Sequence, residues 1–180
     1  MKNNRGFTLI ELLAVIVLLG ILFGLSIPLL INTIHKNKNK IYIEDAKKMI
    51  TQAEYKMSSN SASINKPKAG ECIVFSLKYI DNGSFTTAPN DGNYSKTKSF
   101  VVVRNVGGNF VYDAMIVEES NNNYIGVPLT TFNDLNSNNS YTKVRALKSN
   151  EVIESSSVTK NYINSKISGS NVSKVLGIYS

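Results

Sequence analysis

One carboxylate near the start of an apolar run is the most informative chemical group of this sequence. The chain opens MKNNRGFTLIE, and nearly every residue from Leu12 to Ile31 is apolar. An ionised acid at the centre of a membrane-spanning helix costs about 2.5–3.5 kcal/mol. Glu11 therefore needs a counter-ion or a specific role, and an ordinary membrane anchor offers neither.

Other side chains with the chemistry for catalysis are few. The 180 residues include one histidine, His35, and one cysteine, Cys72, with no acidic residue that the sequence identifies as their partner. The sequence lacks a P-loop, a Gly-x-Ser-x-Gly elbow and a His-x-x-x-His metal pair. Glu118 and Glu119 lack the spacing of calcium ligands. We therefore expect no enzyme activity, no cofactor and no metal site.

The apolar run has the length of a membrane span. About 20 residues at about 1.5 Å each cross a hydrocarbon layer of about 30 Å. Lys2 and Arg5 precede it, as expected for an N-terminus retained in the cytoplasm. A conventional cleaved signal is disfavoured, because Glu11 lies within a run that is long for such a signal. Positive charge also follows the span, so charge alone leaves the orientation open: His35, Lys36, Lys38 and Lys40.

An amphipathic pattern follows the span. Apolar residues recur at steps of three and four, which predicts a helix with one apolar face. They are Ile43, Ala46, Ile50, Ala53 and Met57. Neither glycine nor proline occurs between Leu29 and Lys56, so the sequence predicts one helix of nearly 50 residues, ended by the polar cluster 58–61.

The remainder has the pattern of strands separated by polar turns. The Gly107-Gly108 pair joins two runs rich in β-branched and aromatic residues, which predicts a tight hairpin. Segment 158–167 fits a short helix or a strand, and residues 121–123 and 133–140 are expected loops. The expected strands are Cys72–Ile80, Phe100–Val106, Phe110–Val117, Tyr124–Val127 and Val172–Tyr179.

The Gly6-Phe7 junction, with Glu11 as the fifth residue after it, resembles the processing motif of type IV pilins and pseudopilins, the class III signal peptide. This resemblance implies that a prepilin peptidase cuts after Gly6 and that the new amine of Phe7 is methylated. It also implies an ion pair between Glu11 of one subunit and the Phe7 ammonium group of the next. Gly20 and Pro28 match the helix-weakening residues of the family.

The resemblance further implies an α+β pilin fold, a long N-terminal helix packed on an antiparallel β-sheet head. The expected divisions are a leader (1–6), a transmembrane and assembly half of the helix (7–31), an amphipathic half (32–57) and a β-rich head (58–180). Many members close a C-terminal loop with two cysteines, whereas Cys72 stands alone. The topology after Tyr124 therefore stays open.

By this resemblance, we expect a structural subunit of a bacterial surface filament, with its precursor in the cytoplasmic membrane. Expected partners are the prepilin peptidase, other pilin subunits and an inner-membrane assembly platform; nucleic acid is an alternative without support in the sequence. Adhesion, motility, secretion and DNA uptake stay open as roles. Alternatives are a pseudopilin of a secretion or DNA-uptake system and an uncleaved, membrane-anchored binding protein.

Overall fold

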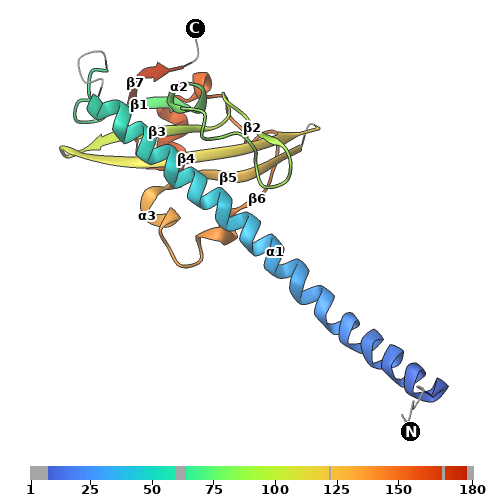
Figure 1. Ribbon diagram of the computed structural model, residues 1–180. Helices are drawn as coiled ribbons and strands as arrows, with labels where there is room; N and C mark the ends of the chain where they lie inside the picture. Colours follow the sequence, from blue (N-terminus) through green and yellow to red (C-terminus); the bar gives the residue numbers. More distant parts are fainter. Residues whose placement is uncertain (1–7, 60–63, 122, 168, 178–180) are drawn as a thin grey trace. The chain divides into compact units, whose positions relative to one another are not determined.

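The computed structural model describes residues 8–59, 64–121, 123–167 and 169–177. Two compact units divide the chain, residues 1–37 and residues 38–180. The helix α1 (Leu9–Ser59) belongs to both units, and all strands belong to the second (Figure 1).

Helix α1 confirms the expectation of one long N-terminal helix. The side chains of its apolar first part are not covered by other residues of the chain, and its buried residues all lie in the second unit. They recur at helical spacing, so that they form one stripe against the sheet. The stripe consists of Tyr42, Ile43, Ala46, Met49, Ile50, Ala53 and Met57.

The second unit contains a seven-stranded sheet in the order β6-β5-β4-β3-β1-β7, with β2 pairing with β4. All neighbouring strands are antiparallel except β1 and β7, which are parallel. The α+β class, with a long helix packed on a mostly antiparallel sheet, is therefore confirmed. The strands are β1 (Glu71–Ser76), β2 (Asn93–Tyr94), β3 (Phe100–Val106), β4 (Asn109–Ser120), β5 (Asn123–Thr131), β6 (Arg145–Leu147) and β7 (Asn171–Leu176).

The predicted glycine hairpin is present between β3 and β4. Val106 pairs with Asn109, and the φ angles of Gly107 and Gly108 are +60° and +92°. Residues with a Cβ rarely adopt such angles, which is why a glycine pair suits this two-residue turn.

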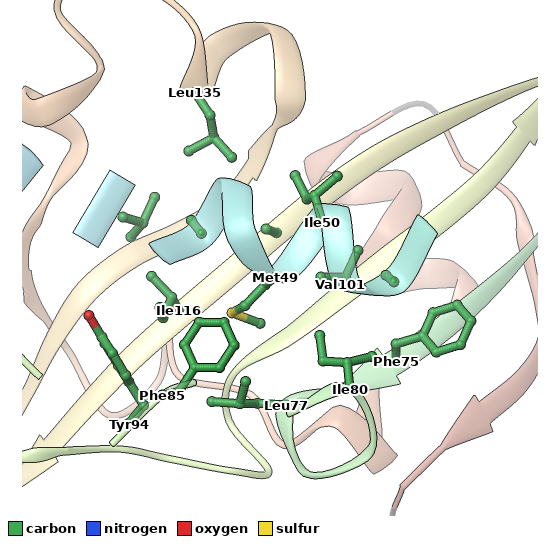
Figure 2. Packing of buried hydrophobic residues seen from close by; sticks show 14 of the residues in the cluster. Met49, Ile50, Phe75, Leu77, Ile80, Phe85, Tyr94, Val101, Ile116 and Leu135 are labelled. Carbon is green, nitrogen blue, oxygen red and sulfur yellow. The ribbon is translucent and has the colours of Figure 1, made fainter. Parts of the chain in front are cut away.

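Both faces of the sheet are buried. Phe75 and Val101 pack in one core with Met49 and Ile50 of α1, as the close view shows (Figure 2), and Ile73 belongs to the same core. The alternate residues of the same strands, such as Cys72 and Val74, pack on the opposite face. There they contact apolar side chains from the C-terminal part of the chain, Leu147, Val158 and Ile163. The head thus has a third layer, which explains why β1 and β3 have continuous rather than alternating apolar sequences.

Several predicted boundaries in the sheet were wrong, among them the end of the strand expected over Phe110–Val117, which continues as β4 to Ser120. The strand expected over Cys72–Ile80 ends at Ser76, and α2 (Leu77–Ile80) follows as one helical turn that buries its first and last residues. The strand expected over Tyr124–Val127 continues to Thr131 as β5. Pro128 lies where the register between β5 and β4 shifts, and it lies beyond the residues of β5 that pair with β6. The N–H group that proline lacks is therefore not needed for a hydrogen bond between strands.

Short helices replace part of one expected loop and form in the segment that fitted either a helix or a strand. The loop expected over 133–140 contains most of α3 (Phe132–Leu135), whose first turn is capped by Thr131. The ambiguous segment 158–167 forms α4 (Lys160–Lys166), capped by Thr159. Two single 3-10 turns also occur, Ser140–Lys143 beside α1 and Ser155–Ser157 ahead of α4.

Candidate functional site

The first turn of α1 holds the carboxylate of Glu11 in a capping box. Thr8 precedes the helix, and its backbone N–H and its hydroxyl group each donate to Oε2 of Glu11 at 2.8 Å. In return, the N–H of Glu11 donates to Oγ1 of Thr8 at 3.4 Å. These reciprocal bonds satisfy backbone donors that a helix start leaves free. A negative charge at this position also interacts favourably with the positive end of the helix dipole.

Sequence reasoning overlooked this role of Glu11. The signal was present, because Thr8-x-x-Glu11 is the spacing of a capping box ahead of an apolar run. The contact gives the carboxylate two donors within its own chain. Thr8 is neutral, however, so the charge itself is not compensated, and a counter-ion would still stabilise it in a medium of low dielectric constant. Gly6 and Phe7, the predicted processing residues, lie outside the described residues.

From Leu9 to Ile34, α1 has apolar side chains on all sides. Among the described residues, α1 is the one helix that is long and apolar enough to cross a membrane, and the apolar stretch is not buried within the chain. A helix that is apolar all round is stable against lipid or against other apolar helices, not against water. The exposed large side chains of this stretch are Leu9, Ile10, Leu12, Leu13, Val15, Ile16, Val17, Leu18, Leu19, Ile21, Leu22, Phe23, Leu25, Ile27, Leu29, Leu30, Ile31 and Ile34.

The predicted helix-weakening residues lie within this stretch, and the helix passes through both without a break. Pro28 has no N–H to donate to the carbonyl group of Gly24, four residues earlier, so the helix lacks one backbone bond there. Apart from the adjoining backbone of the helix itself, no atom of the described residues comes within 4 Å of a Cβ placed at Gly20 or Gly24. Packing within the single chain therefore does not require these glycines.

The other candidates from the sequence do not form a reactive group. Cys72 is fully buried, and burial raises the pKa of its thiol to about 11, which suppresses the reactive thiolate. His35 is an exposed residue of α1. Within the described ranges, no group of three or more histidine, cysteine, aspartate or glutamate side chains could hold a metal ion.

Glu118 and Glu119, adjacent in the sequence, have different environments. Glu119 pairs with Lys98 at 3.1 Å. Glu118 is only 2% exposed, and its carboxylate accepts bonds from the N–H groups of Gly92 (2.8 Å) and Asn90 (3.3 Å) and from the hydroxyl group of Tyr42. Such a fully bonded carboxylate connects α1, a loop and β4, which is a structural role.

Comparison with known proteins identifies the N-terminal part of the chain. Residues 1–27 match the prokaryotic N-terminal methylation motif, the class III signal peptide of type IV pilins. No curated protein and no solved structure matches the chain significantly. The motif points to a structural subunit rather than an enzyme, and together with the apolar helix it fits a membrane-anchored precursor of the pilin or pseudopilin kind.

Proposed function

We propose that this protein is a structural subunit of a bacterial type IV pilus or pilus-like filament. Its precursor lies in the cytoplasmic membrane with the N-terminus inside, a prepilin peptidase cleaves it after Gly6, and Phe7 becomes N-methylated. The observation that carries the proposal is the exposed apolar surface of α1, which begins within the methylation motif and continues beyond it to Ile34. The subunit then polymerises through this helix.

The apolar surface of α1 suits both the membrane, where the precursor lies, and the filament, which the subunit then enters. In the precursor, lipid chains cover the apolar side chains from Leu9 to Ile34; in the filament, the equivalent helices of other subunits cover them. Because both surroundings are apolar, transfer from membrane to filament does not require exposing this surface to water. The space around Gly20 and Gly24 suits close approach of neighbouring helices.

Glu11 has a second role in this proposal. Its carboxylate lies at the end of α1 where cleavage would create the cationic amine of Phe7, four residues before it in the chain. The Phe7 ammonium group of a neighbouring subunit would compensate the charge that Thr8 leaves uncompensated. This pair would fix the axial register between subunits, because any other register leaves two charges unpaired in an apolar environment.

Mass spectrometry of filaments sheared from cells tests the proposal. We expect this chain to be abundant in them and to begin with N-methylated Phe7. Replacement of Gly6 by a bulky residue should leave uncleaved precursor in the membrane, whereas replacement of Asn3 in the leader serves as a control that preserves cleavage. An extracellular form that still begins with Met1, or normal cleavage of the Gly6 variant, would contradict the proposal.

A further inference from the structure

A hollow of about 270 Å³ lies between α1 and the segment 137–141, within the second unit. Two lysines of α1 line it, seven residues and thus two helical turns apart, so both lie on the same side of the helix. Polar residues of the facing segment supply hydroxyl and amide groups. The lining comprises Lys40, Ile43, Glu44, Lys47, Ser137, Asn138, Ser140 and Tyr141.

The charges in this hollow leave a net positive group. Lys47 is paired with Glu44 at 2.9 Å, so these two charges compensate each other. Lys40 is exposed, and no ion pair with it occurs among the described residues. An ammonium group beside amide and hydroxyl donors has the chemistry of a site for a phosphate diester.

The position of Lys40 along the sequence indicates where such a phosphate comes from. Exposed apolar side chains of the span continue to Ile34, and α1 is continuous from there to Lys40. Six residues correspond to about 9 Å of helix, and the headgroup layer adds about 5–7 Å on each side of the hydrocarbon core. A lysine side chain, which extends its ammonium group toward the interface, covers the difference.

We propose that this hollow binds the phosphate group of an anionic phospholipid while the subunit is in the membrane. The inference rests on the membrane placement of α1 in the proposed function, but not on cleavage or polymerisation. It also gives a role to positive charge after the span, which the orientation rule for membrane proteins does not explain. Lys40 would hold the outer end of the helix at the headgroups.

Spin-labelled lipids test this with the full-length precursor in phosphatidylcholine bilayers. The ratio between motionally restricted phosphatidylglycerol and restricted phosphatidylcholine measures selectivity for the anionic headgroup. A lysine near an anionic surface changes lipid affinity about fivefold, so we expect Lys40→Gln to remove a selectivity of that order. Lys2 and Arg5 on the other side of the span contribute a background common to all variants.

Two further variants separate the hollow from general surface charge. Lys48→Gln removes an exposed lysine eight residues further along α1, about 12 Å from Lys40, and should keep the selectivity. Asn138→Ala retains every charge but removes an amide that lines the hollow, and should reduce the selectivity. Equal losses in Lys40→Gln and Lys48→Gln, or no loss in Asn138→Ala, would overturn the proposal.

Two other outcomes are also decisive. If soluble glycerol phosphate abolishes the selectivity at millimolar concentration, the hollow is a site for a soluble phosphate and the assignment to lipid is wrong. Polarised infrared spectroscopy of the same bilayers reports whether α1 crosses them. A chain that inserts without lipid selectivity contradicts this inference alone, whereas a chain that fails to insert contradicts the proposed function as well.

Discussion

The hydroxyl group of Tyr42 donates a hydrogen bond to the carboxylate of Glu118, and both side chains are buried although 76 positions separate them in the chain. Asn90 contributes to the same network through its side-chain amide, which donates to the Tyr42 oxygen at 2.9 Å. Burial, together with the adjacent carboxylate of Glu118, raises the pKa of Tyr42 and keeps the phenol protonated. The network therefore connects α1 to β4 and to the loop before β2.

Removal of the Tyr42 hydroxyl should destabilise the head. Tyr42→Phe keeps the ring in the core but leaves the buried carboxylate with one donor fewer, so we expect the free energy of unfolding to fall by about 1–3 kcal/mol. Urea unfolding of the full-length protein in detergent, followed by near-ultraviolet circular dichroism, measures this. Tyr55→Phe is the matched control, because Tyr55 lies on the same helix and is 69% exposed. Equal stabilities of the two variants would contradict the role of the network.

A buried ion pair joins β3 and β4 on the face opposite α1. Nε and Nη2 of Arg104 donate to the two carboxylate oxygens of Asp113 at 2.6 Å and 3.2 Å, and both side chains are nearly inaccessible. Asp113→Ala would remove the carboxylate that binds this buried guanidinium group, which we expect to cost about 3–5 kcal/mol. The same urea experiment measures this loss.

A double substitution provides the control for that pair. Arg104→Met combined with Asp113→Leu removes both charges and retains apolar volume, so it should recover most of the stability lost in Asp113→Ala. If the double variant is as unstable as Asp113→Ala, the loss comes from packing rather than from the broken ion pair.

A surface ion pair gives the head a defined response to acid. Arg145 donates two hydrogen bonds to Glu151, at 2.7 Å and 2.9 Å, and lowers the pKa of that carboxyl to about 2 from an ordinary value of 4.5. Because the folded state binds this proton less readily, the contribution to stability is complete above about pH 4.5 and is lost as the pH falls toward 2.

The comparison of pH profiles tests this assignment. Glu151→Gln cannot titrate, so the difference in stability between the natural protein and the variant should decrease as the pH falls from 5 toward 2. Thermal unfolding at a series of pH values measures it, with Glu54→Gln, an exposed residue of α1, as the control. A difference that stays constant over this range would contradict the contribution of the Glu151 ion pair.

The two roles of Glu11 can be separated by substitution. Glu11→Gln retains a side-chain oxygen that accepts the bonds from Thr8 but removes the charge, whereas Thr8→Val removes the hydroxyl group and retains the charge. If the charge pairs with the Phe7 ammonium group, Glu11→Gln should be cleaved normally yet enter filaments poorly. Thr8→Val, which loses about 1 kcal/mol of capping, should assemble far better.

Immunoblots of sheared filaments and of membranes, with precursor and processed forms resolved by size, measure both steps. Thr8→Ser serves as the control that preserves both the cap and the charge. Filament incorporation of Glu11→Gln at the natural level would exclude a role for the ion pair in register. Failure of Thr8→Val alone would instead assign the function of Glu11 to the cap.

The sequence determined the features that depend on local order along the chain. The apolar run and the stripe from Ile43 to Met57 predicted α1, because helical periodicity is read directly from spacing. The Gly107-Gly108 pair predicted the β3–β4 hairpin, because few residues other than glycine tolerate its backbone angles. The basic leader with Gly6, Phe7 and Glu11 likewise predicted the methylation motif that residues 1–27 match.

Only the tertiary structure decided what depends on contacts between distant segments. Nothing in the order of residues indicated that β7 pairs with β1 in parallel, or that Leu147 and Ile163 cover the second face of the sheet. The structure likewise distinguished Glu118, buried with its donors, from its partly exposed neighbour Glu119, which pairs with Lys98. Burial and partner choice are properties of the packed chain, and segments far apart in sequence supply the partners, so no local pattern specifies them.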